Sequence, residues 1–400
     1  MKILIADKLS PLAAEQLTAD GNEVRTEPSF STDDLVSQIG NTNVLVVRST
    51  KVTKDVIDAA GKLGLIIRAG AGFNTIDVEC ASDRGIYVAN CPGKNADAVA
   101  ELAIGLLVAA DRQIVNANVD LRNGEWAKSK YGKSYGLKGR TLGILGFGAI
   151  GKAVAKRALG MEMKVLAWSR SLTDNVADQH QVQRAESALD VAKQSDAVSV
   201  HLPLSDATRH FVGTEFLQQM RPASILINTS RGELVDTAAL KDAVEAKQLK
   251  VGIDVFEDEP SGGKAAFTQT DLASMVTCTP HIGASTDQTA EAIAAEVVKI
   301  VRDYRERGFP SSPVNMKRTS SAACRLTVQH LNKVGVLATI LDGLRAENIN
   351  VLEMQNAIFD GAKTASCTLR LDAMPDSKWL ERLVPENEAI LNATIQTHAT

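Results

Sequence analysis

Residues 141–151 read TLGILGFGAIG, an apolar run that leads into the pattern G-x-G-x-x-G at Gly146, Gly148 and Gly151. The run predicts a buried strand over 142–145. Between a strand and a helix, the first glycine permits a tight turn and the second lets backbone approach a pyrophosphate. The third allows close helix–strand packing. The stretch therefore predicts a dinucleotide-binding βαβ unit; the alternative is a glycine-rich turn without a ligand.

The segment that follows predicts a helix over 148–159, whose N-terminus would hold the phosphates beside Ala149 and Ile150. The next strand ends in Ser169 and Arg170. An NAD-binding domain usually carries an acidic residue here for the ribose 2′-hydroxyl, whereas arginine accommodates a 2′-phosphate. The pair therefore favours NADP(H), unless Arg170 is a solvated loop residue.

Similar runs lie on both sides of the glycine stretch. After it, strands are predicted at 164–168, 197–200, 224–228, 251–254 and 275–278. Before it, strands at 3–6, 44–47 and 65–67 alternate with amphipathic helices at 10–19, 32–39 and 53–60. Both series are typical of parallel sheets covered on two faces. The predicted fold class is α/β, with two Rossmann-like doubly wound lobes.

Two long helices frame the second lobe. The segment 95–110 is apolar on all sides, which predicts burial between domains or subunits. The segment 286–307 is strongly periodic, and we expect this helix to return to the first lobe.

The composition shifts at 308–313 and again at 317–321, which predicts a linker. The last eighty residues then form a separate α+β unit. Its predicted order is βαββαβ, with strands and helices at 325–329, 335–346, 350–357, 364–371, 377–383 and 393–397.

The composition excludes several classes of protein. The chain has 400 residues, enough for two or three domains, and 44 basic against 48 acidic residues give a net charge of −4. That balance argues against nucleic-acid binding. The longest uncharged apolar run, 102–110, is too short for a membrane helix, and the N-terminus does not have the pattern of a signal peptide. Five widely spaced cysteines argue against a disulfide framework or a metal site. We expect a cytoplasmic protein.

Polar clusters follow three strands of the second lobe: NTSRGE at 228–233, DVFEDEP at 254–260 and TPHIG at 279–283. Ligands of open α/β sheets bind at such strand ends. There His281 would exchange a hydroxyl proton, Glu259 would hydrogen-bond its other ring nitrogen, and Arg231 would grip a carboxylate. A packed loop histidine, a structural arginine ion pair and a solvated acidic turn are the alternatives.

In order and spacing, these clusters and the glycine stretch resemble the D-isomer-specific 2-hydroxyacid dehydrogenases over about 1–315. The resemblance implies Arg231, Glu259 and His281 as the catalytic triad and NAD as the usual cofactor. It implies Thr229, Asp254 and Gly283 as further cofactor contacts. It also implies a split chain, with a substrate-binding domain of 1–92 and 284–315 around a dinucleotide-binding domain of 93–283.

Three further stretches, VRSTKVT at 47–53, RAGAG at 68–72 and NCPG at 90–93, resemble the phosphoglycerate dehydrogenases of that family. This implies 3-phosphoglycerate as the substrate. Basic residues would neutralise its phosphate and a backbone loop would hold its carboxylate. The implied substrate contacts are Arg48, Lys51, Ala71, Gly72 and Lys128. The alternative is that the basic residues form surface ion pairs.

Residues 323–400 resemble an ACT domain, a small-molecule sensor of amino-acid enzymes. His330, Asn332 and Asn350 match its effector positions, which implies L-serine as the ligand and regulation of the first step of serine biosynthesis. The chain departs from the family at Val334, where proline is usual. Paired ACT hairpins would give a homodimer or homotetramer, and an ACT unit used only for oligomerisation is the alternative.

Two other functions stay open. The first is an NADPH-dependent glyoxylate or hydroxypyruvate reductase, which Ser169 and Arg170 favour. The second is a non-catalytic dinucleotide-sensing protein, against which the intact set of Arg231, Glu259 and His281 speaks.

Overall fold

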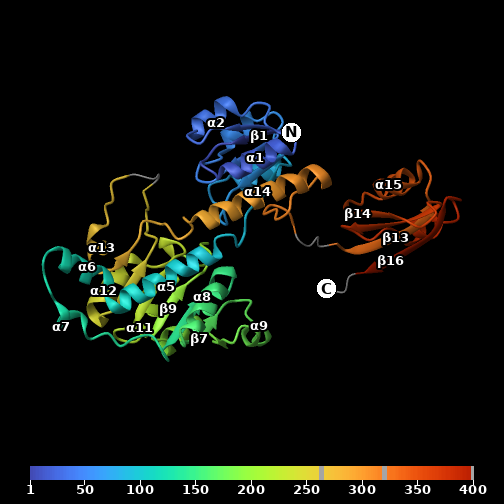
Figure 1. The fold of residues 1–400 in the computed structure, drawn as a ribbon. Helices are drawn as coiled ribbons and strands as arrows, with labels where there is room; N and C mark the ends of the chain where they lie inside the picture. Colours follow the sequence, from blue (N-terminus) through green and yellow to red (C-terminus); the bar gives the residue numbers. More distant parts are fainter. Residues whose placement is uncertain (261–264, 318–321, 398–400) are drawn as a thin grey trace. The chain divides into compact units, whose positions relative to one another are not determined.

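The computed structural model describes residues 1–260, 265–317 and 322–397. The chain divides into two compact units, Met1–Asn315 and Met316–Thr400 (Figure 1). The predicted linker segment 317–321 lies almost entirely outside the described residues.

The first sheet has five parallel strands in the order β2-β1-β3-β4-β5. Its strands are β1 (Lys2–Ile5), β2 (Glu23–Thr26), β3 (Val44–Val47), β4 (Leu65–Arg68) and β5 (Tyr87–Asn90). The helices are α1 (Pro11–Ala19), α2 (Thr32–Gln38), α3 (Lys54–Ala59), α4 (Val78–Asp83) and, from much later in the chain, α14 (Asp287–Arg307).

Alternating side chains of these strands are buried on both faces of the sheet, as its doubly covered architecture requires. Ile3 and Ile5 pack with α1 and α14 on one face, whereas Leu4 packs with α2, α3 and α4 on the other. After α14, Val314 N–H donates to Val88 O, and Asn315 Oδ1 accepts from Val88 N–H at 2.9 Å. The segment 308–313, predicted to be a linker, therefore belongs to the first unit.

The second sheet has seven parallel strands in the order β12-β11-β10-β9-β6-β7-β8. The strands are β6 (Thr141–Leu145), β7 (Lys164–Trp168), β8 (Gln183–Arg184), β9 (Ala197–Val200), β10 (Ile225–Asn228), β11 (Lys250–Ile253) and β12 (Thr277–Cys278). Only the two-residue edge strand β8 was not predicted, because its exposed Gln-Arg pair has no strand pattern.

Helices cover both faces of this sheet, and the predicted α/β fold class is confirmed. On one side lie α5 (Ala96–Arg112), α8 (Ala149–Gly160) and α9 (Asp174–Gln179). On the other lie α10 (Ala188–Gln194), α11 (Thr214–Gln219), α12 (Thr237–Lys247) and α13 (Thr270–Met275). Two short helices, α6 (Ile114–Arg122) and α7 (Lys128–Tyr131), and the 3₁₀ turn η1 (Gly232–Leu234) complete the unit.

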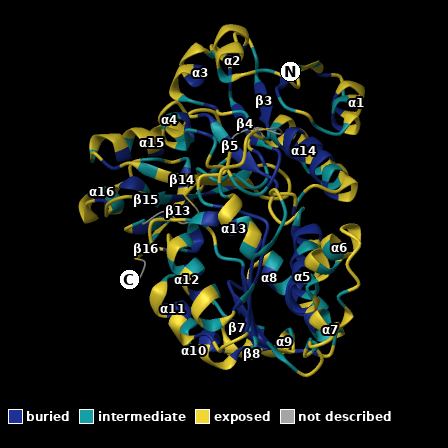
Figure 2. Ribbon diagram, turned by 90° about the vertical axis from the view of Figure 1, so that its left-hand side faces the viewer, coloured by how far each residue is buried: buried dark blue, intermediate teal, exposed yellow. Residues whose placement is uncertain are grey.

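Helix α5 explains the apolar segment at 95–110. It packs against α8, β10 and β11, and Figure 2 shows it buried along most of its length. Its last turn carries the buried Asp111, which accepts from Ser134 Oγ at 2.6 Å and pairs with Arg140 at 3.2 Å. Asp111 therefore has both a hydrogen-bond donor and a cation as partners. These contacts connect the end of α5 to the segment 134–140 that leads into β6.

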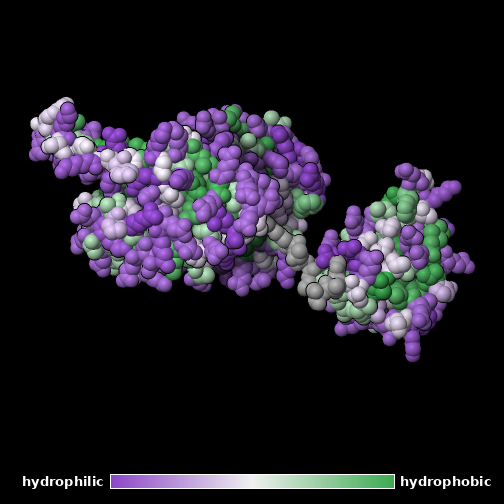
Figure 3. Space-filling model, turned by 90° about the horizontal axis from the view of Figure 1, so that it is seen from below, coloured by the Kyte–Doolittle hydropathy of each residue, from purple (hydrophilic) through white to green (hydrophobic). Residues whose placement is uncertain are grey.

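The second unit is a four-stranded antiparallel sheet in the order β14-β15-β13-β16, with the predicted βαββαβ sequence. Its elements are β13 (Cys324–Leu331), α15 (Val336–Ala346), β14 (Val351–Ile358), β15 (Thr364–Leu371), α16 (Ser377–Leu383) and β16 (Ile390–Thr397). Alternate residues of the central strands β13 and β15 are buried under the helices, whereas the edge strand β14 is mostly exposed. Figure 3 shows hydrophobic residues gathered on part of the visible face of this unit.

None of the described helices is long and apolar enough to cross a membrane.

Candidate active site

The glycine loop after β6 has the backbone geometry that a dinucleotide requires. Gly146 adopts φ +94°, and a Cβ there would collide with His201 O. A Cβ on Gly151 would collide with Gly146 O, so both positions need glycine for packing. By contrast, a Cβ on Gly148 would meet no described atom within 4 Å, which leaves the backbone at the start of α8 open to a ligand.

Two buried polar atoms beside this loop have no hydrogen-bond partner among the described residues: Thr229 Oγ1, after β10, and His201 Nδ1, after β9. His201 Nε2 lies 2.8 Å from Ser199 Oγ, and burial lowers the pKa of His201 to about 3, so the ring is neutral. Buried polar groups are normally satisfied. These residues therefore fit a polar cofactor at the strand ends, as Thr229 was predicted to do.

Ser169 and Arg170 follow β7 on the same edge of the sheet. Trp168 before them stacks on Phe211 with ring centroids 5.5 Å apart, which holds the strand end in place. Arg170 is exposed and has no ion pair within the described chain. Its guanidinium is available to a phosphate.

Asp254, at the end of β11, is buried and organises the loop that carries His281. Its carboxylate accepts from Thr279 Oγ1 at 2.5 Å and from the N–H groups of Ile282 and Gly283 at 2.8 Å each. A Cβ on Gly283 would lie 3.0 Å from Asp254 Oδ2, so glycine permits this contact. Asp254 and Gly283 therefore act together as a support for the strand end.

The structure brings Glu259 and His281 together. His281 Nδ1 lies 2.6 Å from Glu259 Oε2, and Glu259 Oε1 accepts from Phe256 N–H at 3.0 Å. Burial raises the pKa of Glu259, but the hydrogen bonds from His281 and Phe256 and the nearby charges of His281 and Arg231 lower it more. The carboxyl is therefore ionised, and His281 Nε2 is the ring nitrogen left for a substrate.

Arg231 extends from the second sheet towards the loop after β4. Its Nη1 donates to Ser230 O at 2.6 Å, and its backbone O accepts from Asn228 Nδ2 at 2.8 Å. A Cβ on Gly72 would lie 2.9 Å from Arg231 Nη2. The predicted carboxylate loop and Arg231 are therefore neighbours, and Ala71 O is held by Asn90 Nδ2 at 2.5 Å.

A residue that sequence reasoning missed, Arg68, lies beside them. It ends β4, its Nε donates to Arg48 O at 3.1 Å, and its guanidinium folds over Gly70. Burial, and then the positive charges of Arg231 and Arg48, lower the pKa of Arg68. Its position at the end of a predicted strand, as the first residue of RAGAG, could have indicated a ligand-binding residue.

We call Arg48, Arg68 and Arg231 the arginine cluster. Within the described residues, none of the three forms an ion pair with a carboxylate. The carboxylate of Asp7 lies nearby but accepts from backbone, from Arg48 N–H at 2.6 Å and from the N–H groups of Ser49 and Thr50 at 3.0 Å. The cluster is therefore an excess of positive charge that an anion would neutralise.

The other predicted basic contacts are placed differently. Lys51 is exposed at the turn before α3. Lys128 begins α7 and lines a surface hollow of about 530 Å³ with Trp126, Ser129, Gly132 and Lys133, none of which belongs to the arginine cluster. Figure 1 shows α7 at the outer end of the second lobe. The structure does not bring Lys128 to Arg48 or Arg231.

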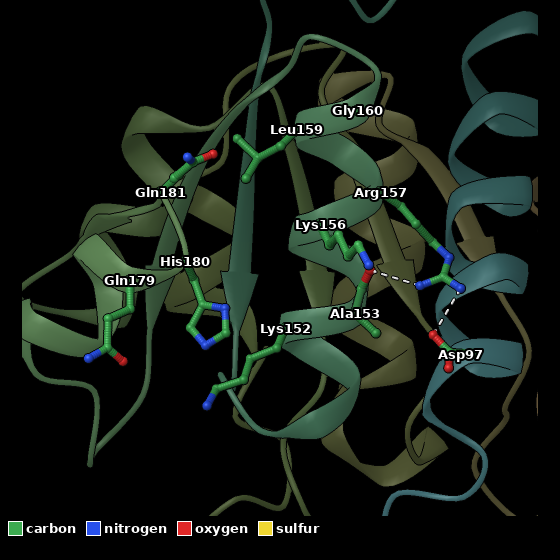
Figure 4. A pocket seen from close by; sticks show the side chains of 10 residues that line it. All are labelled: Asp97, Lys152, Ala153, Lys156, Arg157, Leu159, Gly160, Gln179, His180 and Gln181. Atoms are coloured by element: carbon green, nitrogen blue, oxygen red, sulfur yellow. Dashed lines mark hydrogen bonds and ion pairs between the residues drawn. The ribbon is translucent and has the colours of Figure 1, made fainter.

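A second surface hollow, of about 650 Å³, lies between α8, α9 and the start of α5 (Figure 4). Lys152 and Lys156 line it from successive turns of α8, and His180 faces them. Arg157 also lines it and pairs there with Asp97 of α5, 3.0 Å from its carboxylate. The hollow contains none of the residues predicted to bind substrate or cofactor, so it is separate from the strand-end site.

In the second unit, the three predicted effector residues differ in access. His330 is buried, with Nδ1 2.8 Å from Leu331 O and Nε2 3.1 Å from Asn356 Oδ1. Asn332 is exposed and donates from Nδ2 to Ala362 O at 3.0 Å, and its Oδ1 has no hydrogen-bond partner among the described residues. Asn350 is exposed at the start of β14. Asn332 and Asn350 are thus the accessible members.

The glycine loop and the polar strand ends place the chain in the class of doubly wound dinucleotide-binding proteins. A family model described as "D-isomer specific 2-hydroxyacid dehydrogenase, NAD binding domain" matches residues 104–283. The chain is 40% identical over 300 residues to the hydroxypyruvate reductase of Thermotoga maritima, covering 74% of this chain and 95% of that protein. The chain belongs to the D-isomer-specific 2-hydroxyacid dehydrogenase family, whose NAD-binding domain it contains.

Other relatives carry different names. The chain is 38% identical over 318 residues to a D-3-phosphoglycerate dehydrogenase of Methanocaldococcus jannaschii; the match covers 79% of this chain but only 60% of that relative's length. The structure of a glyoxylate reductase from Paecilomyes thermophila matches with a TM-score of 0.69 at 28% identity, covering 78% of this chain and 98% of that one. Similarity alone therefore does not select the substrate.

Proposed function

We propose that the protein interconverts 3-phospho-D-glycerate and 3-phosphohydroxypyruvate with NAD(P), the first step towards L-serine. The observation that carries this proposal is the arginine cluster. A substrate with one carboxylate would engage Arg231 and the loop at 71–72. It would leave Arg48 and Arg68 with only the nearby Asp7, whose carboxylate accepts from backbone N–H groups. A phosphate on the same substrate supplies that charge, because arginine binds phosphate with parallel hydrogen bonds.

The chain's own residues then have defined tasks. Arg231 and the backbone of Ala71 and Gly72 hold the carboxylate, and Arg231 polarises the carbonyl that is reduced. His281 Nε2 gives a proton to the new hydroxyl or takes it in the reverse direction, while ionised Glu259 stabilises the charged ring. A bound nicotinamide dinucleotide would supply or accept the hydride; the glycine loop, Thr229 and Arg170 would hold it.

The organisation of the chain is part of this proposal. Residues 1–92 with 284–315 would bind the substrate, residues 93–283 the dinucleotide, and residues 323–400 an effector. The exposed apolar side chains of Leu352, Met354 and Ile358 on β14 support a homo-oligomer in which these edge strands pair.

A panel of 2-oxo acids tests the substrate, followed at the nicotinamide absorbance with NADH and NADPH. We expect faster turnover of phosphohydroxypyruvate than of glyoxylate. The reverse order would support the glyoxylate reductase, which exposed Arg170 favours through NADPH. Dinucleotide binding without turnover of any 2-oxo acid would instead indicate a sensing protein.

The Arg170→Asp variant tests the cofactor assignment. Because a charge-assisted arginine–phosphate contact contributes about 1.5–3 kcal/mol, we expect the kcat/KM ratio of NADPH to NADH to fall roughly 10- to 100-fold. Arg122→Asp, on α6, is the matched control and should leave the ratio unchanged. An unchanged ratio in Arg170→Asp would remove this residue from the cofactor site.

The Asn332→Ala variant tests the effector site. Serine should inhibit the wild-type enzyme, and losing one hydrogen bond to its ammonium group, about 1.5–3 kcal/mol, should raise the half-inhibitory concentration at least roughly tenfold. Basal turnover should not change. Asn392→Ala, on the neighbouring strand β16, is the control. Serine inhibition that survives in Asn332→Ala would exclude this asparagine, and no inhibition of the wild type would favour an ACT unit used for oligomerisation.

A further inference from the structure

The DVFEDEP loop carries two glutamates, and each is paired with a histidine. Glu259 pairs with His281 in the site described above. Glu257 pairs with His210, with 2.6 Å between Glu257 Oε1 and His210 Nε2. Nothing in the proposed chemistry uses this second pair, and His210 lies 47 residues away along the chain.

Glu257 also forms hydrogen bonds with two further segments, one at the start of α12 and one just before α13. Its Oε2 accepts from Thr237 N–H at 3.1 Å, at the start of α12, and its backbone O accepts from Gln269 Nε2. The side chain of Glu257 is about one-fifth exposed, at 22%, so its bonds are shielded in part from water.

The segment enclosed by these contacts is the turn that carries Arg231. On one side of it, His210 N–H donates to Glu233 O at 2.8 Å and Val212 N–H donates to Leu234 O at 2.9 Å. On the other side, the peptide between Phe256 and Glu257 lies against Gly232, where a Cβ would collide with it. The turn η1 is thus held between the 210–212 segment and the DVFEDEP loop, and the His210–Glu257 pair closes the ring around it.

The same loop also fixes Glu259, because Phe256 N–H donates to Glu259 Oε1. A single run of backbone therefore sets the position of Arg231 through Gly232 and the position of His281 through Glu259. We infer that the His210–Glu257 pair is a positioning device that fixes Arg231 relative to Glu259 and His281. The inference rests on the proposed function only in that Arg231 and His281 act on the same substrate.

Removing His210 or Glu257 should loosen the position of Arg231 relative to Glu259 and His281, while every group assigned to the substrate or the cofactor is kept. We expect His210→Ala to lower kcat roughly tenfold, because displacement of a group that acts in the transition state costs rate more than binding. Dinucleotide Kd should stay close to wild type, and the thermal midpoint should fall by no more than a few degrees, the cost of alanine at the φ of +52° that His210 adopts. His210→Gln, whose amide can still donate to Glu257, should restore most of kcat.

A double-mutant cycle with Glu257→Ala separates this role from a general loss of stability. If the pair acts as a unit, the double variant should be no slower than the slower of the two single variants. Arg184→Ala is the matched control. It removes an exposed ion pair between Arg184, on β8 of the same sheet, and Asp174, on α9, and it should keep full kcat.

Two results would overturn the inference: a folded His210→Ala protein with wild-type kcat, or losses of kcat that add in the double variant. If His210→Ala fails to fold, His210→Asn carries the same test, because asparagine tolerates the φ of +52° at this position and its shorter amide cannot replace Nε2 at Glu257. All variants are assayed with whichever 2-oxo acid the wild type turns over fastest. The substrate assignment can therefore fail while the positioning role is still decided.

Discussion

Replacing His281 by asparagine should lower kcat for reduction by roughly 10²- to 10⁴-fold, the usual contribution of a positioned general acid. Asparagine suits the site in two ways. His281 has φ +52°, a left-handed conformation that asparagine tolerates better than most residues, and the asparagine amide can donate to Glu259 in place of Nδ1. The variant therefore keeps the fold and loses only the group that exchanges the proton.

Rapid-mixing turnover and dinucleotide titration together measure this effect. The Kd for the dinucleotide should change by less than about twofold, since His281 is assigned to the proton and not to cofactor binding. Gln179→Ala, an exposed residue beside the separate surface hollow, is the control and should keep full activity. Loss of dinucleotide binding in His281→Asn, or an unchanged kcat, would make His281 a structural residue.

The second large effect is expected in the arginine cluster. Changing Arg48 and Arg68 together to glutamine should lower kcat/KM for phosphohydroxypyruvate by roughly 10²- to 10⁴-fold, because each charge-assisted contact to phosphate contributes about 1.5–3 kcal/mol. With hydroxypyruvate, which lacks the phosphate, the same variant should change less than about threefold. Steady-state assays of both substrates give the two ratios directly.

This pair of measurements separates phosphate binding from other roles of the cluster. Arg25→Gln, an exposed arginine paired with Glu27, is the control for loss of surface charge. Because Arg68 carries a buried like charge beside Arg48 and Arg231, its removal should not lower the thermal midpoint. Equal losses with both substrates would show that the cluster supports the active site in general and does not recognise phosphate.

Local patterns in the sequence were enough to predict most of the fold. The glycine stretch and the apolar runs around it carry period and turn signals within a few residues, and the α/β class is confirmed. Three strands escaped prediction. Strand β2, the mostly exposed EVRT, and β8, two polar residues at a sheet edge, carry no such signals and are strands because a neighbour pairs with them. Strand β5 (Tyr87–Asn90) is short, apolar and buried, and the sequence reading missed it.

The candidate site likewise contains residues whose proximity could be predicted from the sequence and residues whose proximity could not. Glu259 and His281 follow strands that are neighbours in the sheet, so their meeting could be predicted from topology, although their roles stay predictions. The sequence alone did not single out Arg68, because its part in a charged cluster depends on Arg48 and Arg231, which come from other segments of the chain. The pair of His210 and Glu257 likewise joins loops after different strands. Lys128, which the family resemblance implied as a substrate contact, lies on α7, and its role also stays a prediction.

The substrate is tested most directly by the wild-type enzyme with a matched pair, phosphohydroxypyruvate and hydroxypyruvate, which differ only in the phosphate. Reduction of each is followed at the nicotinamide absorbance under the same conditions. With two arginines assigned to the phosphate, kcat/KM should favour phosphohydroxypyruvate by at least about 10²-fold. A ratio near or below one would contradict the account, because the arginine cluster would then have no phosphate to bind.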